Sequence, residues 1–222
     1  MIDKEPETPR SSMLRPILLA AVLGVVAGLA GVYGIAGLKR NATLSEPDPA
    51  CRETVNAAKR LMPLVHGEVA AFTLTETPRR LPELNFNDDV GKQVQLAEFR
   101  GRTVLINLWA TWCIPCRKEM PTLDRLSGAM SRNQFVVVSI NLDAHDTNKS
   151  RKFFSEIGVQ NLTYYEDANN KVFQQLKRVG RAIGLPTSIL VDSNGCELGY
   201  LAGPADWSSD EAIKLLKAAS AN

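Results

Sequence analysis

Cys113 and Cys116 are the residues of this 222-residue chain whose type and spacing suit reversible disulfide chemistry. They follow an apolar run, residues 104–109, that is typical of a parallel strand covered by helices on both faces. Two thiols on the first turn of a helix that leaves such a strand can close a small disulfide ring and open it again. The pattern predicts a carrier of two electrons, with a structural disulfide or half of a zinc site as the alternatives. A zinc ribbon needs two such pairs, and the other cysteines, Cys51 and Cys196, stand alone.

The expected position of Cys113 at a helix N-terminus favours its thiolate, which is the attacking species in disulfide exchange. Unpaired N–H groups and the helix dipole stabilise negative charge there, and Arg117 and Lys118 add positive charge nearby. Pro115 suits the first helical turn because its nitrogen carries no hydrogen that would go unpaired. We therefore expect Cys113 to be the exposed nucleophile and Cys116, one turn deeper, to be the thiol that resolves the mixed disulfide.

The segment from Trp109 to Pro121, WATWCIPCRKEMP, resembles the active-site segment of the TlpA/ResA/CcmG branch of the thioredoxin superfamily. The likeness extends over nearly the whole chain. It implies an α/β, thioredoxin-like fold with a central mixed sheet, an N-terminal hairpin and helix extension, and a central insertion. It also implies an enzyme without a cofactor: a membrane-anchored thiol-disulfide oxidoreductase that reduces partner proteins during biogenesis of the copper centre of cytochrome oxidase.

The resemblance also implies roles for residues around the cysteine pair. Pro186 matches the family's cis-proline, which faces the disulfide and leaves backbone groups free to pair with an extended partner segment. Glu119 matches an acidic residue that, if partly buried, can accept the proton of Cys116, three positions earlier. The alternative for Glu119 is an exposed acid paired with a basic neighbour. The residues expected to contact the partner are Trp112, Ile114, Pro115 and Leu185.

The two remaining cysteines form a second candidate site. If Cys113 pairs with Cys116, the one remaining pair is Cys51 with Cys196, and in the TlpA branch an extra structural disulfide fits these positions. Such a bond needs an oxidising compartment. The alternative is two unlinked buried thiols.

Residues 17–38 contain no charged side chain and are rich in Leu, Val, Ala and Gly. A helix needs roughly 20 apolar residues to cross a bilayer. We therefore expect a cytoplasmic N-terminus over residues 1–16, an uncleaved transmembrane anchor over 17–38, a linker over 39–50 and a thioredoxin-like domain over 51–222. A cleaved signal peptide is the alternative. Basic residues are balanced on the two sides of the anchor, so charge does not set its orientation. The cysteine pairing favours a periplasmic domain held on the inner membrane.

Hydrophobic periodicity predicts the elements that position these residues. Helices are expected over residues 51–62, 113–130, 147–157, 169–179 and 210–219, and strands over 69–74, 84–86, 93–96, 104–109, 135–140, 162–165, 188–191 and 196–201. Hairpin turns are expected over residues 88–92 and 192–195, and a strand–helix–strand unit over 104–140. The first helix should bury Cys51, Val55, Ala58 and Met62, and the last Ala212, Ile213, Leu216 and Ala219.

Composition and charge limit the partners. The net charge is +2 without a basic stripe and aromatic residues make up 6%, so we expect no nucleic acid. The resemblance implies a periplasmic copper chaperone or a cytochrome oxidase subunit as substrate, and a membrane thiol reductant of the DsbD/CcdA type as electron donor. The alternatives are a reductant for cytochrome c maturation, a copper-binding assembly factor of the Sco type, or a structural tether. The Sco family uses a Cys-x-x-x-Cys pair and a downstream histidine; here His66 and His145 lie outside clear ligand spacing, and no metal site is expected.

Overall fold

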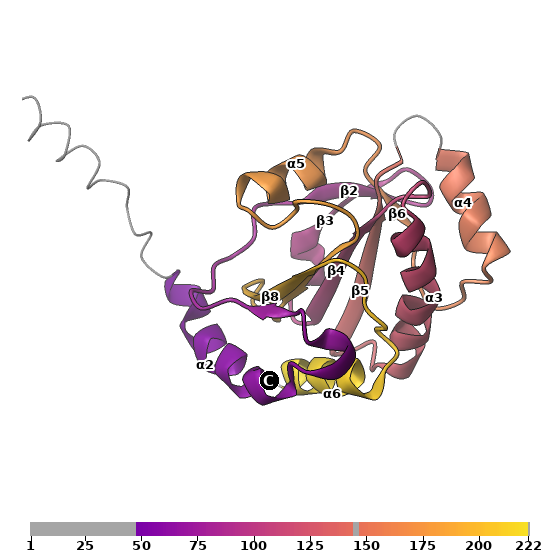
Figure 1. Ribbon diagram of the computed structural model, residues 1–222. Coiled ribbons are helices and arrows are strands. Elements are labelled where there is room, and N and C mark those ends of the chain that lie inside the picture. Colours follow the sequence, from indigo (N-terminus) through magenta and orange to yellow (C-terminus); the bar gives the residue numbers. More distant parts are fainter. Residues whose placement is uncertain (1–47, 144–146, 222) are drawn as a thin grey trace, which may run out of the picture. The chain divides into compact units, whose positions relative to one another are not determined.

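The computed structural model describes residues 48–143 and 147–221, and these residues build one mixed β-sheet with helices on both faces (Figure 1). The sheet order is β1-β8-β7-β4-β5-β6-β2-β3. The strands are β1 (Thr73–Leu74), β2 (Asn85–Asp88), β3 (Gln93–Gln95), β4 (Thr103–Trp109), β5 (Phe135–Asn141), β6 (Tyr165–Glu166), β7 (Thr187–Val191) and β8 (Glu197–Ala202). The helices are α2 (Arg52–Leu61), α3 (Ile114–Ala129), α4 (Thr147–Glu156), α5 (Lys171–Arg178) and α6 (Asp210–Ser220).

The centre of the sheet confirms the predicted strand–helix–strand unit. β4 and β5 run parallel in register from Thr103 opposite Phe135 to Trp109 opposite Asn141, and α3 connects them. β7 pairs antiparallel with β4 on its other side, and β8 returns from β7 through the predicted turn at residues 192–195. The predicted hairpin β2–β3 joins the same sheet through β6. The mixed sheet therefore places the carboxyl end of β4, which leads to Cys113, between β5 and β7.

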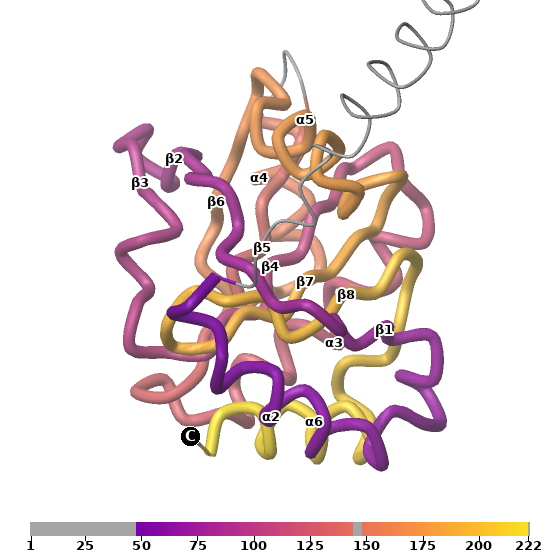
Figure 2. The backbone as a smooth tube through the Cα atoms, turned by 90° about the vertical axis from the view of Figure 1, so that its left-hand side faces the viewer, coloured from indigo at the N-terminus to yellow at the C-terminus, as the bar shows by residue number. Residues whose placement is uncertain are grey.

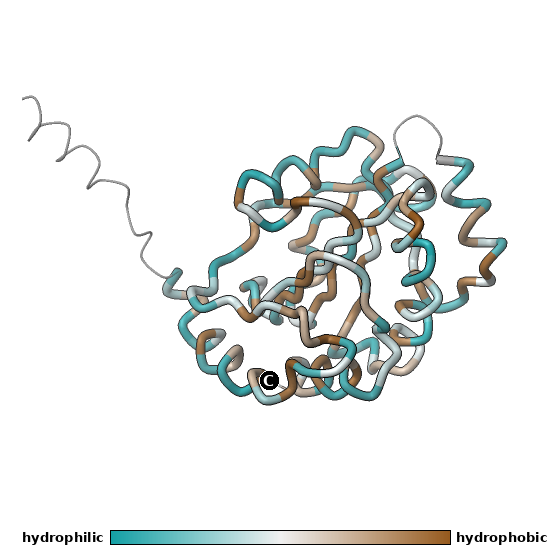
Figure 3. The backbone as a smooth tube through the Cα atoms, viewed as in Figure 1, coloured by the Kyte–Doolittle hydropathy of each residue, from teal (hydrophilic) through white to brown (hydrophobic). Residues whose placement is uncertain are grey.

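Alternation along the strands divides the interior into two apolar layers. In β4, Leu105 and Trp109 face the layer that includes residues of α2, α3 and α6, whereas Ile106 and Leu108 face the layer that includes residues of α5 and the β2–β3 hairpin. Every residue of β4 is buried, as expected for a strand covered on both faces. Figure 3 shows hydrophobic residues concentrated along these central strands. Asn107 lies between Leu105 and Trp109 on the α3 side of β4. It is a polar side chain between two apolar ones on this face.

α2 packs against α6 and β8, and the two helices lie side by side in Figures 1 and 2. The buried stripe of α2 differs from the predicted one: Val55 is half-buried and Met62 is 63% exposed. The stripe instead consists of Thr54, Ala57, Ala58 and Leu61. These positions follow the i, i+3, i+4, i+7 spacing of a regular helix. Met62 lies outside it because α2 ends at Leu61 and a tighter 3₁₀ turn containing Pro63 follows.

Other differences concern short elements. The strand predicted over residues 69–74 is reduced to β1, because Gly67–Val69 form a 3₁₀ turn, and the strand predicted over 162–165 is displaced to β6. Pairing with β8 sets the ends of β1, and pairing with β2 and β5 sets the ends of β6. Each strand has two residues, which is too short for hydrophobic periodicity to indicate. The helix predicted over 113–130 is confirmed as α3, which continues through Pro121. In α6, Leu215 is buried and Ile213 only partly so.

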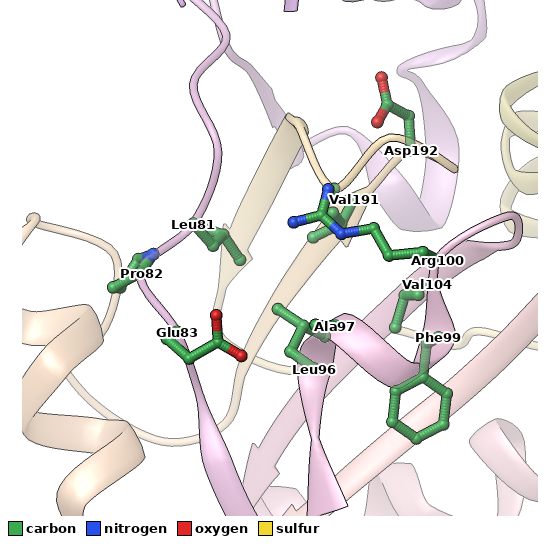
Figure 4. A pocket seen from close by; sticks show the side chains of 11 residues that line it. Leu81, Pro82, Glu83, Leu96, Ala97, Phe99, Arg100, Val104, Val191 and Asp192 are labelled. Atoms are coloured by element: carbon green, nitrogen blue, oxygen red, sulfur yellow. The ribbon is translucent and has the colours of Figure 1, made fainter. Parts of the chain in front are cut away.

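The β7–β8 turn contains a glycine whose positive φ disfavours other residues. Gly195 has a φ of 80°, and a Cβ atom at this position would lie 2.1 Å from Nη1 of Arg100. Figure 4 shows Arg100 beside Val191 and Asp192. These residues line a hollow of about 20 Å³. This volume has room for about one water molecule. The hollow includes Val104, near the start of β4, so it lies at the opposite end of this strand from the cysteine pair.

The predicted cytoplasmic N-terminus (1–16), the anchor (17–38), most of the linker (39–50) and His145 lie outside the described residues. Among residues 48–143 and 147–221, no helix is both long enough and apolar enough to cross a membrane.

Candidate redox site

Cys113 and Cys116 form a disulfide at the N-terminus of α3, with 5.3 Å between their Cα atoms. Cys113 is the N-cap residue, and its sulfur accepts a hydrogen bond from the backbone N–H of Cys116 at 3.3 Å. Reduction of the disulfide therefore leaves a sulfur at position 113 with an N–H donor and the helix dipole directed at it. Both features stabilise a thiolate.

The prediction that Cys113 is exposed is wrong for this oxidised form. Cys113 is 5% exposed and Cys116 is completely buried. The bond to the buried Cys116 holds the Cys113 side chain inside the apolar layer, with which both residues pack. The side chains of its two neighbours in the chain are exposed instead: Trp112 is 66% exposed and Ile114 is 68% exposed. Cys113 is still the less buried of the two sulfur residues.

The loop between β4 and Cys113 is fixed by polar groups at the end of β5. The backbone N–H of Thr111 donates to both carboxylate oxygens of Asp143, at 3.2 and 3.1 Å. Asn141 donates to the same carboxylate at 3.0 Å, and the N–H of Leu142 donates to the carbonyl of Trp109. Sequence reasoning missed Asn141 and Asp143. The sequence did contain a signal, because Asn141 and Asp143 follow the apolar run at residues 135–140. The end of that strand lies beside the end of β4.

Glu119 lies inside the molecule, three residues after Cys116 on α3. It is 2% exposed, which excludes the alternative of an exposed helix acid. Burial raises the pKa of Glu119 from its ordinary value of 4.5 to about 7. Hydrogen bonds oppose this shift: the indole N–H of Trp207 and the backbone N–H of Ala205 donate to Oε1, and the amide of Asn107 donates to Oε2 at 3.3 Å. A carboxyl group with a pKa near 7 exchanges its proton readily at neutral pH.

A row of polar side chains crosses the sheet at Asn107. Asn107 lies opposite Ser188 on β7 and opposite Ser139 on β5. The Asn107 amide donates to the Ser188 hydroxyl at 3.1 Å, and the Ser139 hydroxyl donates to the Asn107 carbonyl oxygen at 3.2 Å. These three residues were missed in the sequence although each interrupts an apolar strand. The row satisfies the Asn107 amide and orients it toward Glu119.

The peptide bond between Leu185 and Pro186 is cis, as the resemblance implied. Pro186 is buried and directly precedes Thr187, which pairs with Leu108 near the carboxyl end of β4. The cis-proline loop therefore lies at the same end of the sheet as the cysteine pair. Within the described residues, the backbone N–H and carbonyl groups of Leu185 form no hydrogen bond. These groups are therefore free to form hydrogen bonds with an extended partner strand, as the edge of a sheet is.

The predicted partner-binding residues lie on both sides of the disulfide. Trp112, Ile114 and Pro115 are exposed, and Leu185 is half-buried. Of the two basic residues near the pair, Arg117 places its guanidinium over the Phe153 ring, 5.0 Å from the ring centroid. Trp109 lies in the core behind, stacked on Phe154 at 5.2 Å.

Cys51 and Cys196 form the second disulfide, with 5.6 Å between their Cα atoms. Both residues are buried. The bond joins the start of α2 to the start of β8, and the hydroxyl of Thr54 supports the same junction by donating to Asp192 at 2.5 Å. This disulfide joins residues 145 positions apart. Its place beside the β7–β8 turn is at the other end of the sheet from Cys113.

In the part of the chain that the structure describes, no three His, Cys, Asp or Glu side chains form a group that could hold a metal ion. His66 is exposed before a 3₁₀ turn.

Comparison with known proteins relates the chain to thiol-disulfide oxidoreductases. The model of the AhpC/TSA family matches residues 77–196. The thiol-disulfide oxidoreductase ResA of Bacillus thuringiensis subsp. konkukian is 33% identical over 128 residues, which are 58% of this chain and 70% of that protein.

Solved structures show the same relation. A Chlorobium tepidum protein assigned as the thiol:disulfide interchange protein DsbE is 28% identical, with a TM-score of 0.55 over 63% of this chain and 94% of that one. A DsbF homologue from Corynebacterium diphtheriae is 22% identical, with a TM-score of 0.55 over 67% of this chain and 90% of that one, and supports the fold alone. The predicted thioredoxin-like α/β fold is thereby confirmed.

Proposed function

The chain belongs to the AhpC/TSA family and is a thiol-disulfide oxidoreductase of the ResA/CcmG type, and on that basis we propose that it reduces partner disulfides through Cys113 and Cys116 during assembly of the copper centre of cytochrome oxidase. The observation that carries the assignment of the two cysteines is their disulfide at the N-terminus of α3, above the buried Glu119.

The reaction proceeds in two exchange steps. The Cys113 thiolate attacks one sulfur of the partner disulfide, forms a mixed disulfide, and releases the other partner sulfur as a thiolate that takes up a proton. Cys116, after losing its proton, attacks the Cys113 sulfur and closes the Cys113–Cys116 bond while the second partner sulfur leaves. The partner gains two electrons and two protons, and this chain is oxidised. A dithiol donor reverses the exchange and restores the reduced form.

Glu119 is the proposed acceptor for the proton of Cys116. Cys116 is buried, so its thiol has no direct access to bulk water, and Glu119 lies on the same helix three positions later. Residues at this spacing lie on one helix face. A carboxylate with a pKa near 7 accepts a proton at neutral pH without holding it permanently. Trp207 and Asn107 hold the carboxylate by hydrogen bonds and so act as positioning residues.

The partner segment is proposed to pair with the open backbone groups of Leu185, before cis-Pro186, in the manner of an added β-strand. Trp112 and Ile114 provide exposed apolar surface on the other side of the disulfide. An extended cysteine-containing segment would thus bring its sulfur to Cys113 between these two contacts.

The cellular setting is also a proposal. The apolar run at residues 17–38 supports a single anchor in the inner membrane, and the buried Cys51–Cys196 disulfide fits a domain in the oxidising periplasm. The proposed electron donor is a membrane thiol reductant of the DsbD/CcdA type. The proposed substrates are a copper chaperone or a cytochrome oxidase subunit whose metal-binding cysteines must be reduced.

Reduction for cytochrome c maturation is a second candidate. The resemblance seen in the sequence includes ResA and CcmG/DsbE, which are cytochrome c maturation proteins. The likeness to ResA and to the DsbE protein therefore favours this candidate. Both candidates share the chemistry at Cys113 and differ in the partner.

A trapping experiment separates the two. Cys116→Ser in the full chain should accumulate mixed disulfides in cells, because the resolving thiol is missing, and Cys113→Ser is the matched control that forms none. We expect the trapped partner to be a copper chaperone or oxidase subunit. Recovery of apocytochrome c alone would replace the first candidate by the second. Tight copper binding by the reduced chain, without any trapped partner, would favour a copper-binding assembly factor of the Sco type.

A further inference from the structure

A hollow with a positively charged rim lies directly beside Cys113. Its lining includes Trp112, Ile114, Arg117, Lys149, Lys152 and Phe153, and we refer to it as the basic hollow. Its volume is about 430 Å³, within the range of roughly 300–1,000 Å³ found for ligand sites. Trp112 and Ile114 are the immediate neighbours of Cys113 in the chain, so an occupant of the basic hollow contacts both residues that flank the nucleophile.

Arg117 is held in place by an aromatic ring. Its guanidinium lies over the ring of Phe153, which in turn contacts Trp109 with 5.7 Å between ring centroids. Among the residues that the structure describes, no carboxylate forms an ion pair with Arg117. Stacking on an aromatic ring fixes the plane of a guanidinium while its N–H edges can still donate to a carboxylate.

The other charges at the rim favour an anion as well. Lys149 and Lys152 come from α4, and the one acid in the lining is Glu156. Glu156 forms an i,i+4 pair with Lys152 at 3.8 Å, and both side chains are well exposed. Such exposed pairs are weak. The lining therefore contains three basic side chains and one acidic side chain, and Arg117 is the base on which the anion site depends.

A second hollow on the opposite side of Ile114 has the opposite charge balance. It is lined by Pro115 and Lys118 of α3 together with Glu68 and Asp206. The buried carboxyl of Glu119 also belongs to its lining. The surface around the disulfide is thus positive toward α4 and acidic toward the segment that precedes α6. A partner segment that crosses the disulfide meets these two environments in a fixed order.

We propose that the basic hollow binds a carboxylate side chain of the partner protein, so that the preferred substrates carry Asp or Glu a few residues from the attacked cysteine. This inference rests on the proposed function, because the occupant is a segment of the disulfide substrate. A protein segment fits better than a lipid headgroup, since the hollow shares Trp112 and Ile114 with the surroundings of Cys113. Charge complementarity of this kind selects partners and speeds their encounter.

The test uses the reduced full chain and synthetic peptides of one cysteine, each in a mixed disulfide with uncharged 2-mercaptoethanol. Glu is placed in turn at each of the three positions before and after the cysteine, and Gln replaces it in the matched peptide. The measured quantity is the ratio of second-order rate constants for the Glu and Gln peptides. At one or two positions we expect a ratio of about two to five, the size expected for exposed ion pairs. The ratio should fall toward one in 0.5 M salt.

Variants assign the effect to the basic hollow. Arg117→Gln and Lys152→Gln should each lower the ratio toward one. Lys118→Gln removes the same charge from the same helix but faces the other hollow, so it should keep the ratio. A ratio of one at every position, or a preference that survives both Arg117→Gln and Lys152→Gln, would overturn the inference. A ratio of one together with Arg117-dependent binding of the chain to anionic vesicles would indicate that the hollow binds lipid. That result would also overturn the inference.

The same assay separates this inference from the function on which it rests. Equal reduction of the Glu and Gln peptides leaves the proposed reductase in place and removes only the acidic preference. Failure to reduce either peptide contradicts the reductase function itself.

Discussion

Glu119 is the residue whose surroundings differ most from those of an ordinary carboxylate. Its burial raises the pKa to about 7, while Trp207, Ala205 and Asn107 stabilise the charged form by hydrogen bonds. Desolvation is the larger effect, so at neutral pH the group is divided between its two protonation states. In the proposed mechanism, this residue links the buried thiol of Cys116 to proton exchange.

Glu119→Gln tests the raised pKa through stability. The folded pKa of about 7 lies above the ordinary value of 4.5, so between these pH values the folded chain binds more protons than the unfolded chain. The free energy of unfolding should therefore fall as the pH rises from about 4.5 to 7, by roughly 3 kcal/mol. Denaturant titration at several pH values should show this slope in the native chain, and Glu119→Gln should reduce it by about this amount. The exposed acid variant Glu156→Gln should keep it.

Trp207→Phe tests the hydrogen bond that opposes the shift. Loss of the indole donor should raise the pKa of Glu119 further, because the Trp207 hydrogen bond is the largest influence that lowers it. If Glu119 accepts the proton of Cys116, the pH profile of mixed-disulfide resolution should move upward by roughly one pH unit. Stopped-flow measurement of that step gives the midpoint. The exposed-site control Trp112→Phe should leave the midpoint in place, and an unmoved midpoint in Trp207→Phe would refute the positioning role.

At the scale of elements, α2 and β8 form the part of the fold that the Cys51–Cys196 disulfide secures. The double variant Cys51→Ser, Cys196→Ser should lower the free energy of unfolding by up to about 4–5 kcal/mol, because the closed loop is long. Denaturant titration checks this value. Thr54→Val, which breaks only the hydrogen bond to Asp192 at the same junction, should cost about 1 kcal/mol. The rate of exchange at Cys113 should persist in the folded double variant; its loss would contradict the separate roles of the two disulfides.

The pairing of β8 with β1 depends on a glycine. Gly199 pairs with Leu74, and a Cβ atom at this position would lie 2.4 Å from the Phe72 ring and 2.5 Å from the backbone oxygen of Thr73. Gly199→Ala should therefore destabilise the fold by about 1–3 kcal/mol. Gly184→Ala, where the space is open, should change stability by less than about 0.5 kcal/mol. Thermal or denaturant unfolding compares the two, and equal effects would be inconsistent with the close approach.

The central elements could be predicted from the sequence because their signals are local. Residues 104–109 and 135–140 are continuous apolar runs, and the cysteine pair and Pro115 mark the start of α3. The residues that hold Glu119 could not be predicted in this way. Trp207 lies 88 positions from Glu119, and Asn107 reaches it from a neighbouring strand, so their contacts exist only in the folded chain. The burial of Cys113 was missed for a related reason, since helix position alone says nothing of what packs around it.

At the scale of the whole molecule, the family match ends at Cys196, yet residues on both sides of the matched range complete the described domain. Cys51 and α2 precede the range and are joined to it by a disulfide. Trp207 follows it and closes over Glu119. Outside the matched range, the chain thus has one bond that secures α2 and one side chain that holds the buried Glu119. The anchor at residues 17–38 and the periplasmic location remain predictions from the sequence.

The most direct test of the account is the redox equilibrium of the full chain against glutathione buffers of increasing reducing power. Alkylation followed by peptide mass analysis reports which sulfurs are free at each step. The account predicts that Cys113 and Cys116 become free together in a reversible two-electron transition, while the buried Cys51–Cys196 bond stays closed. A Cys113–Cys116 bond that stays closed throughout, or one that opens only when Cys51 and Cys196 also do, would contradict it.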